Sequence, residues 1–283
     1  ETRLLHHKVR VQWNHRLESV ETKDGGIVAQ VAHLDRVATG YPIAGAEWMV
    51  TKTLAIHAKY VVGADGYHSR IREELGLTYE GLGPLQTFSV FEFETASDPG
   101  FELAVVLDGE SVSACWPMSD RRCRWSFQVP SAERHDSTIV RLNELIKARA
   151  PWFPEVRGEL LWASMVQFDR RLASGLGAGR LWLAGDSVHM TTPVGVQSMN
   201  AGLVDAHELS WRLADRVRGE RGDDVLASYS AERSRELARL VRPDATAAPA
   251  GAPAWVRRHW GAIGAAIPAT GDQLDALLAP LEA

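Results

Sequence analysis

Residues 179–213, GRLWLAGDSVHMTTPVGVQSMNAGLVDAHELSWRL, combine a strand, a tight turn, a loop and a helix in one stretch. The apolar run 181–184 predicts a short buried strand, and Gly185-Asp186 ends that strand at a sharp turn. The Asp186 carboxylate is therefore expected at the carboxyl end of a strand. Ligands bind at that edge of α/β sheets, where a carboxylate commonly accepts hydrogen bonds from sugar-type hydroxyls.

The second half of this stretch predicts a loop followed by a helix. Pro193 and Gly195 shape the loop, and the helix is expected to begin at about Gln197. Apolar residues then recur at helical spacing, at Met199, Leu203, Ala206, Leu209 and Leu213. Because the amino end of this helix would direct its free N–H groups and positive dipole end into the loop, the loop favours an electron-rich or anionic ligand.

Two motifs in this chain resemble those of a known flavoprotein family. The pattern GDxxHxxxPxGxQxxNxGxxD, residues 185–205, resembles the second flavin motif of the FAD-dependent aromatic hydroxylases, the p-hydroxybenzoate hydroxylase-like family. Upstream, residues 60–72, YVVGADGYHSRIR, contain the DGxxSxxR motif of that family directly after an apolar strand. Smaller matches are FDRR at 168–171 and YSAER at 229–233. By this resemblance the chain is identified as a member of these class A flavoprotein monooxygenases.

The resemblance implies an α/β fold with an incomplete Rossmann-like FAD-binding domain, an inserted mixed β-sheet substrate domain and C-terminal helices. We expect residues 1–83 and 169–241 to form the FAD-binding domain, residues 84–168 the substrate-binding sheet, and residues 242–283 a helical tail. Such an insertion would place a ligand pocket at a domain boundary, which is a common location for small-molecule sites.

Hydrophobic periodicity predicts the individual elements. In the first part, strands are expected at 11–20, 27–34 and 53–62, with a hairpin turn at Asp24-Gly25-Gly26. In the inserted part, strands are expected at 85–95, 101–107, 112–117, 124–129 and 160–168, with an amphipathic helix at 139–150. A later helix should end near residue 241, and a short helix is expected at 272–281.

The GxGxxG turn that holds the ADP half of FAD in this family has no counterpart in the sequence. Residues 1–11 instead resemble a helix that follows the first mononucleotide-binding unit of relatives, so the chain is expected to be amino-terminally truncated. This leaves two hypotheses open. The chain belongs to an aromatic hydroxylase, or it is a non-catalytic flavoprotein-like module that binds an aromatic ligand or a partner.

The resemblance also implies the chemistry. NAD(P)H would reduce FAD, and a flavin 4a-hydroperoxide would transfer oxygen to an activated aromatic ring of a phenol or polyketide-like substrate. Asp186 would bind the ribityl chain, and Pro193 and Gly195 would lie beside the isoalloxazine. The backbone at Met199 and Asn200 would face the pyrimidine edge and stabilise negative charge there. Other relatives epoxidise, decarboxylate or halogenate, and halogenation is disfavoured because the sequence has no GWxWxIP motif.

The upstream motif implies further cofactor-binding residues. Asp65 would support the pyrophosphate-binding region, and Gly66, like Gly185 in the second motif, would supply a turn. Ser69 and Arg72 would brace this turn and shape the approach of the nicotinamide nucleotide. Arg72 has two interpretations, because an arginine near a flavin cleft suits a phosphate-bearing nucleotide, whereas one beside a helix start is also an ordinary solvated residue.

His189 is the one candidate for a catalytic base, since an imidazole titrates near neutral pH and phenol activation requires a proton acceptor. The family commonly has a histidine in this loop, so a structural hydrogen-bonding role is favoured. No histidine pair has a recognised metal-binding spacing, and no metal site is expected. Cys115 and Cys123 match no common metal spacing and are interpreted as buried bystander thiols.

The loop departs from the family pattern at two positions. Relatives commonly have PxGGQGMN where this chain has PVGVQSMN at 193–200, so Val196 and Ser198 replace glycines. A glycine permits positive φ or close backbone approach, and a β-branched valine suits neither. These replacements predict an altered or looser flavin site.

Aromatic and apolar residues on the expected strands are candidates for a substrate wall. They are Phe88, Val90, Trp116 and Phe127, with Trp125 and Trp162 as further members. The alternative is ordinary core, because strand periodicity does not reveal which face meets a ligand. The 10 tryptophans of the chain suggest a large aromatic ligand, but the sequence leaves the substrate open.

Composition indicates a globular protein with a sizeable core, since 45% of the 283 residues are hydrophobic, 24% are charged and the formal net charge is −5. The sequence has no apolar run long enough to span a bilayer, no signal peptide at its start and no basic block typical of nucleic-acid binding. We therefore expect a cytoplasmic protein with a small aromatic substrate and a homodimer as its assembly, without nucleic acid as a partner.

Overall fold

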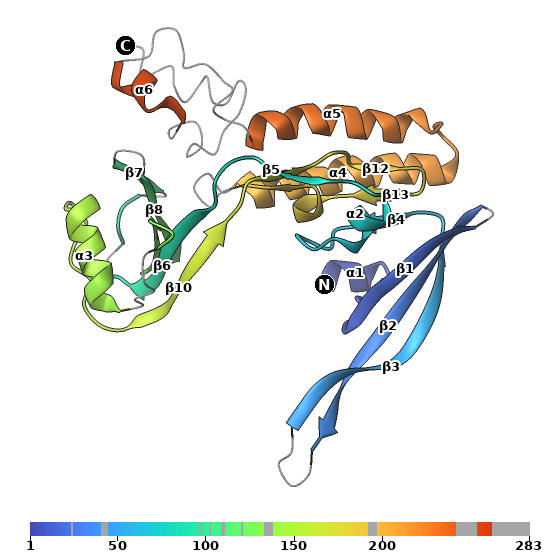
Figure 1. Cartoon of the computed structure of the whole chain (residues 1–283), viewed down its shortest axis with the longest axis horizontal. Helices are drawn as coiled ribbons and strands as arrows, with labels where there is room; N and C mark the ends of the chain where they lie inside the picture. Colours follow the sequence, from blue (N-terminus) through green and yellow to red (C-terminus); the bar gives the residue numbers. More distant parts are fainter. Residues whose placement is uncertain are drawn as a thin grey trace.

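The computed structural model describes residues 1–23, 25–40, 45–96, 98–101, 103–108, 111–119, 121–132, 138–191, 197–241 and 254–261. Figure 1 shows a body of helices and short strands, with a five-stranded sheet on one side and a long three-stranded sheet on the other. This is the expected α/β architecture, in which a separate sheet is inserted between two segments of the body.

Two short strands that are far apart in the sequence lie side by side in the body. β4 (Val61–Gly63) and β13 (Leu181–Leu183) pair in parallel, and β12 (Gly177–Ala178) pairs antiparallel with β13. Helix α2 (Arg70–Glu74) follows β4, and the 3₁₀ turn η1 (Gly185–Ser187) follows β13. Because the carboxyl ends of parallel strands meet at one sheet edge, both sequence motifs converge at that edge.

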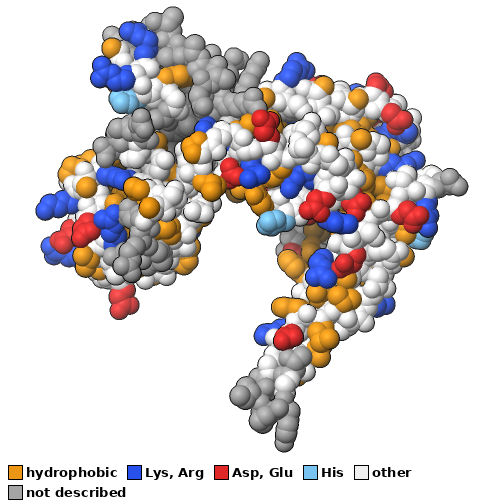
Figure 2. All heavy atoms as spheres, in the orientation of Figure 1, with side chains coloured by type: hydrophobic (Ala, Val, Ile, Leu, Met, Phe, Trp, Pro, Cys, Tyr) orange, Lys and Arg blue, Asp and Glu red, His pale blue; other side chains and the backbone are white. Residues whose placement is uncertain are grey.

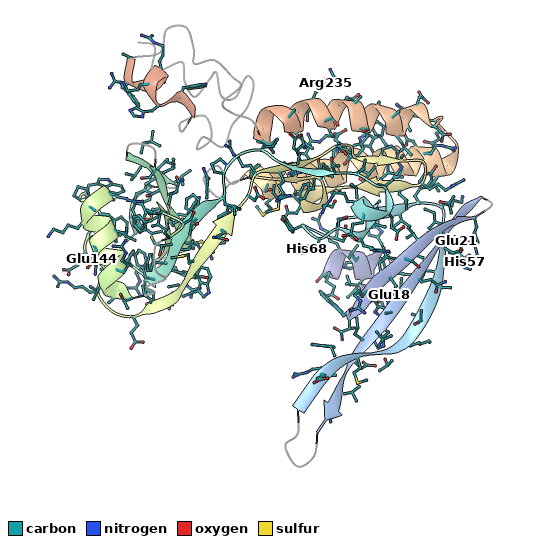
Figure 3. All side chains as sticks on the ribbon, viewed as in Figure 1. Glu18, Glu21, His57, His68, Glu144 and Arg235 are labelled. Atoms are coloured by element: carbon teal, nitrogen blue, oxygen red, sulfur yellow. The ribbon has the colours of Figure 1, made fainter. Side chains whose placement is uncertain are left out.

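Two long helices pack beside these strands (Figure 1). α4 (Gln197–Arg218) begins where the sequence predicts it, and α5 (Asp224–Val241) ends at the expected residue. Figure 3 shows Arg235 on the outer side of α5, while the inner faces supply the buried core. Members of that core are Ile71, Leu176, Leu183, Val188, Leu209, Tyr229 and Leu237.

The smaller elements complete the body. β14 (His189–Met190), β11 (Arg171–Ala173) and β5 (Tyr79–Gly81) form a second small sheet in that order. The expected amino-terminal helix is confined to α1 (Thr2–His6), which has no buried residue. α6 (Ala254–Arg258) is the part of the C-terminal tail that the structure describes, and the helix expected at 272–281 lies outside the described residues.

The inserted sheet has the strand order β10 (Leu160–Phe168), β6 (Gln86–Glu94), β9 (Arg122–Val129), β8 (Ser111–Ser119) and β7 (Ala104–Asp108). All four pairings are antiparallel, so the expectation of a mixed sheet is corrected. α3 (Ile139–Arg149), capped by the Thr138 hydroxyl, packs on one face of this sheet, while Glu144 points outward (Figure 3). The Cys115 and Cys123 thiols are buried in the core between them, and burial raises the pKa of both.

The three-stranded sheet extends away from the body as a long arm (Figure 1). It contains β1 (His15–Lys23), β2 (Gly26–Thr39) and β3 (Gly45–Ala58), all antiparallel. Gly25, with φ +80°, forms the predicted hairpin turn. The strand expected at 53–62 is divided, because β3 ends at Ala58 and β4 belongs to the body. Figure 2 shows hydrophobic side chains along the arm. Trp48, Met49 and Val50 of β3 are exposed.

None of the helices in the described ranges combines the length and the apolar character needed to cross a membrane.

Candidate functional site

The turn after β13 places the Asp186 carboxylate at the surface. Gly185 has φ +68°, which is the left-handed region that a glycine adopts without steric cost. A side chain on Gly202 would place its Cβ 3.3 Å from the Cα of Gly185, so α4 approaches this turn closely. The Asp186 side chain itself is exposed, as a ligand-binding carboxylate requires.

One buried carboxylate, Asp205 on α4, holds this turn in place. Its Oδ2 accepts hydrogen bonds from the Gly185 backbone N–H at 2.9 Å and lies 2.8 Å from His189 Nε2. Its Oδ1 lies 2.8 Å from both Nε and Nη2 of Arg233 on α5. Arg233 also donates to the Ala201 carbonyl at 3.3 Å. The turn, β14, α4 and α5 therefore meet at a single side chain.

The environment of Asp205 keeps it ionised. Burial alone would raise its pKa, but hydrogen bonds and charge from His189, the Gly185 N–H and the Arg233 guanidinium together lower the pKa below its ordinary value. His189 is fully buried, and its Nδ1 has no hydrogen-bond partner in the part of the chain that the structure describes. This geometry supports the structural interpretation of His189, since a buried ring paired with Asp205 does not face solvent.

The upstream motif forms a second turn at the same sheet edge. Asp65 Oδ2 accepts hydrogen bonds from the backbone N–H groups of Arg70 at 2.7 Å and Ile71 at 3.3 Å. Ser69 caps α2, and its Oγ accepts from the Arg72 N–H at 3.0 Å. Gly66 has φ +77°. Asp65 and Ser69 thus fix the start of α2, and this turn depends on both side chains.

Arg72 connects the two motifs. Its guanidinium donates to the Ser187 carbonyl at 2.9 Å and to the Tyr67 carbonyl, and it lies 4.0 Å from the centre of the Tyr79 ring. The side chain is buried, with 7% exposed, so the alternative of an ordinary solvated arginine is wrong. The contacts match the bracing role, whereas contact with a nicotinamide nucleotide stays a prediction.

Two residues that the sequence did not single out complete this junction. The Ser187 hydroxyl lies 2.7 Å from the Gly63 carbonyl and 2.9 Å from the Ala184 carbonyl, both of which can accept its hydrogen bond. The Tyr79 hydroxyl donates to the Asp186 carbonyl at 2.9 Å, and burial raises the pKa of Tyr79. Ser187 and Arg233 fall within quoted motifs, whereas Tyr79 stands in β5 without any recognisable motif.

The start of α4 faces the same region from the loop side. Met199 and Asn200 are exposed in the first turn of the helix, where backbone N–H groups lack intrahelical acceptors. Ser198 lies within the helix and is not among the described residues with positive φ, so it does not need the freedom of a glycine. Pro193, Gly195 and Val196 lie outside the described residues.

Comparison with known proteins decides the family. A family model described as an FAD binding domain matches residues 2–244. The chain belongs to this FAD-binding family. The resemblance to FAD-dependent aromatic hydroxylases predicted from the two motifs is thereby confirmed.

Several relatives of this flavoprotein chain are hydroxylases or oxygenases by name. It is 27% identical to the tetracenomycin A2 monooxygenase-dioxygenase of Streptomyces glaucescens, over 89% of this chain and 43% of the relative. It is 30% identical to an aklavinone 12-hydroxylase of Streptomyces peucetius, over 83% of this chain and 47% of the relative. The chain thus spans less than half the length of these relatives.

A solved structure of aklavinone-11 hydroxylase with FAD and aklavinone is similar to this flavoprotein chain, with a TM-score of 0.68 and 28% identity. The similarity covers 85% of this chain and 44% of that one. A p-nitrophenol 4-monooxygenase from Pseudomonas putida, at 18% identity and a TM-score of 0.68, shares the fold.

The observed turns fit an FAD molecule. An exposed carboxylate, two glycine turns with positive φ and the free N–H groups of a long helix lie along one sheet edge. Clusters of three or more metal-ligating side chains do not occur within the described ranges.

The structure separates the substrate candidates of this flavoprotein into two groups. Phe88, Val90 and Trp116 lie on the face of the inserted sheet that is opposite α3. Phe127 is fully buried on the α3 face, where it stacks on Trp125 with ring centres 4.8 Å apart. Phe127 and Trp125 are therefore core residues rather than parts of the same wall, because side chains alternate across a strand.

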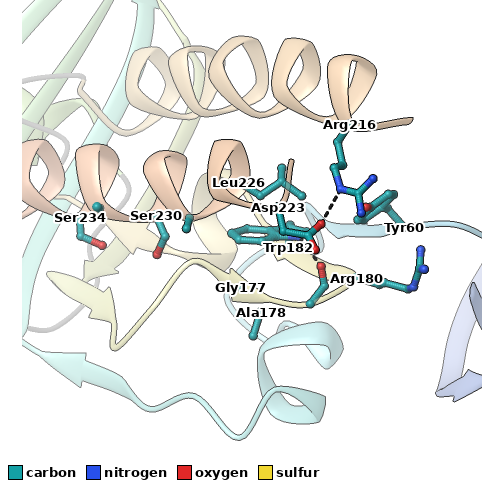
Figure 4. A pocket seen from close by; sticks show the side chains of 13 residues that line it. Tyr60, Gly177, Ala178, Arg180, Trp182, Arg216, Asp223, Leu226, Ser230 and Ser234 are labelled. Carbon is teal, nitrogen blue, oxygen red and sulfur yellow. Dashed lines mark hydrogen bonds and ion pairs between the residues drawn. The ribbon is translucent and has the colours of Figure 1, made fainter. Parts of the chain in front are cut away.

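A cavity of about 660 Å³ lies at the opposite end of β13 from Asp186 (Figure 4). It is bounded by the β12–β13 hairpin, the end of α4 and α5. Its cationic side chains have partners within the chain: Arg216 pairs with Asp223 at 2.5 Å, and Arg180 donates to the Lys59 carbonyl at 3.0 Å. The converging motifs, rather than this cavity, form the candidate flavin site.

Proposed function

We propose that this protein is an FAD-dependent monooxygenase that hydroxylates an aromatic molecule, either a phenol or a polyketide-like compound. NAD(P)H would be the reductant, and dioxygen would supply the oxygen atom. The observation that carries the proposal is the convergence of the Asp65 and Asp186 turns at one sheet edge, joined by Arg72 and Ser187. Bound FAD would supply the redox chemistry, which protein side chains lack.

The chain's own residues would position the cofactor. Asp186 would accept hydrogen bonds from the ribityl chain, and Asp65 would keep the first turn in register for the pyrophosphate region. The amino end of α4, at Met199 and Asn200, would stabilise negative charge on the flavin through its N–H groups and dipole. His189 would act as a positioning residue through Asp205, which holds the Gly185 N–H.

The substrate would bind on the inserted sheet. Phe88, Val90 and Trp116 share the face that is not covered by α3. Phe88 and Val90 are buried in a small core there, so the half-buried Trp116 would offer the aromatic contact to a planar molecule. Two relatives are named putative polyketide hydroxylases, which supports a polyketide-like compound, and two others are named for 3-(3-hydroxy-phenyl)propionate, which supports a phenol.

The second hypothesis is a flavoprotein-like binding module without catalysis. Titration of the purified chain with FAD, followed by visible absorption and flavin fluorescence, distinguishes the two hypotheses. We expect a protein-bound flavin spectrum, with binding weakened about tenfold or more in Asp186→Asn, because a ligand hydrogen bond to a charged group is lost. Asp35→Asn, on the exposed arm, is the control and should bind as the wild type does.

A bound spectrum would be followed by NAD(P)H oxidation and product analysis with phenolic and polycyclic compounds. Hydroxylated product in amounts that track NAD(P)H consumption would support the monooxygenase. Absence of flavin binding by the chain, or equal binding by Asp186→Asn, would count against the proposed site.

A further inference from the structure

A polar row crosses the inserted sheet at its end remote from the body. Strand register places Trp162 of β10 opposite Glu92 of β6, Glu92 opposite Arg124 of β9, and Arg124 opposite Trp116 of β8. We call these four residues the distal row. Cross-strand neighbours project to the same face, so the distal row shares the face of Phe88 and Val90.

The distal row contains two hydrogen-bond donors without acceptors. Trp116 Nε1 and Arg124 Nε are both buried atoms that have no hydrogen-bond partner in the parts of the chain described by the structure. A buried N–H group that leaves water and gains no acceptor is costly, and such groups are normally paired. Two of them on directly opposed residues of one sheet face indicate an acceptor that the protein does not itself supply.

The charge of the row defines that acceptor. Arg124 Nη2 pairs with Glu92 at 2.8 Å, and Arg122 Nη1 lies 3.9 Å from the same carboxylate. The Glu92 side chain is only 14% exposed, so its negative charge lies beside the two donors. A fully anionic ligand would be repelled by the Glu92 carboxylate. A neutral oxygen with lone pairs in a ring plane, such as a ring carbonyl, can accept both N–H groups without that repulsion.

The surroundings of the row favour a flat ligand. Trp162 is 46% exposed, and its ring lies 5.9 Å from the Arg124 guanidinium. An exposed aromatic face beside two inward donors suits a planar ring system that stacks and accepts hydrogen bonds at one edge. Towards the body, the next rows on this face contain Val90 and then Phe88, which lies four residues, or about 13 Å, from Glu92 along β6.

We propose that the distal row binds a ring carbonyl at the far end of an extended, fused-ring substrate, through Trp116 Nε1–H and Arg124 Nε–H. This inference rests on the proposed function, because it assigns a chemical class to the substrate of that site. It makes Trp116 and Arg124 specificity-determining residues that do not contact the flavin.

The test compares two neutral probes of the same size, 2-(hydroxymethyl)anthraquinone and 2-(hydroxymethyl)anthracene, which differ in the ring carbonyls. Their dissociation constants are measured by fluorescence titration or calorimetry on the chain without flavin. We expect the wild type to bind the quinone about tenfold more tightly than the anthracene. Trp116→Phe and Arg124→Lys should each reduce that preference about threefold to tenfold, since each loses one N–H donor.

Trp125→Phe is the matched control, because Trp125 Nε1 is also buried without a hydrogen-bond partner among the described residues but lies on the opposite, α3-packed face. It should retain the full preference for the quinone. Arg124→Lys keeps the positive charge beside Glu92, so its effect reports the lost Nε–H group rather than a broken ion pair. A variant that is partly unfolded binds both probes less well, so the ratio of the two dissociation constants is unaffected by a general loss of folding.

The proposal is overturned if the wild type shows no preference, if neither probe binds, or if Trp125→Phe lowers the preference as much as Trp116→Phe. FAD titrations of the same variants separate this result from the proposed function. Normal FAD binding without a quinone preference would overturn the proposal for the distal row and leave the proposed function standing. A quinone preference that depends on Trp116 in a chain that does not bind FAD would leave the distal row standing and would count against flavin binding at the proposed site of this chain.

Discussion

At the scale of single residues, the site depends on buried polar side chains more than on the exposed ones that touch a ligand. Asp186 and Asp65 could be predicted from the sequence because each follows an apolar strand within a motif. Asp205 and Arg233 were present in the matched patterns, but spacing alone did not reveal that they contact one another. Tyr79 could not be predicted, because its contacts with Arg72 and Asp186 arise from tertiary packing.

Replacement of Asp205 by asparagine should destabilise the fold. Arg233 would lose its buried partner and keep only the ion pair with the exposed Glu236 carboxylate, which costs about 3 kcal/mol in the free energy of unfolding. Because the pKa of Asp205 is lowered in the folded state, its stabilising effect is complete above the unfolded pKa of about 4. The difference between wild type and Asp205→Asn, measured by urea denaturation, should therefore be constant from pH 7 to pH 5 and shrink below about pH 4.

Asp186→Asn is the control for this measurement, because that carboxylate is exposed on the same turn. Its free energy of unfolding should stay within about 0.5 kcal/mol of the wild type. A pH-independent deficit in Asp205→Asn down to pH 2 would contradict the assigned ionisation.

Replacement of Arg72 by glutamine should lower stability by about 2–3 kcal/mol, since hydrogen bonds from a buried cation to two carbonyls and an aromatic contact are lost. Arg70→Gln removes only exposed pairs with Glu73 and Glu74 and should cost less than about 1 kcal/mol. Thermal and urea unfolding of both variants provide the comparison. An unchanged stability of Arg72→Gln would remove the bracing role and leave nucleotide contact as the better explanation.

At the scale of elements, hydrophobic periodicity was sufficient to predict the position of a helix or strand wherever one face of that element is buried. The start of α4, the extent of α3 and the strands of the inserted sheet follow the apolar pattern closely. Strand direction was not predictable, because the alternation of side chains is the same in parallel and antiparallel pairs; the sheet is antiparallel rather than mixed. The division between β3 and β4 was missed because both are apolar and only two residues separate them.

The close contact of α4 with the Gly185 turn predicts the effect of a larger side chain at Gly202. Alanine would raise helix propensity by up to about 1 kcal/mol, but its Cβ would lie at a tight 3.3 Å from Gly185 Cα. Gly202→Val places the same Cβ at that contact and adds two methyl groups beyond it. This variant should displace the turn and weaken FAD binding at least tenfold. Leu203→Val, on the exposed neighbour, should bind FAD normally. Flavin fluorescence titration measures both, and equal affinities would refute the contact.

At the scale of the whole molecule, the body and the inserted sheet have separate hydrophobic cores. Leu237 belongs to the first, while Leu142 belongs to the second. Figure 1 shows the two units joined through the segments that lead into β6 and out of β10. The family resemblance implied two units, but the arrangement of the units and the projecting arm depend on long-range packing that no local pattern encodes.

The two cores predict separable effects of cavity-forming substitutions. Leu142→Ala and Leu237→Ala, both at fully buried positions, should each cost about 2–5 kcal/mol. Leu142→Ala should spare FAD affinity, whereas Leu237→Ala should reduce it, because α5 supplies Arg233 to the flavin-side network. Calorimetry with and without FAD tests this, and equal loss of FAD affinity in both variants would contradict independent cores.

His189 and the Ala201 carbonyl are both held by the Asp205–Arg233 pair, which constrains how this part of the chain can evolve. These residues flank the segment 190–200, and both are tied to the Asp205–Arg233 pair. Because one buried pair holds both ends of this segment, we expect Asp205 and Arg233 to vary together among relatives of the chain, since the loss of either residue deprives the other of its buried partner.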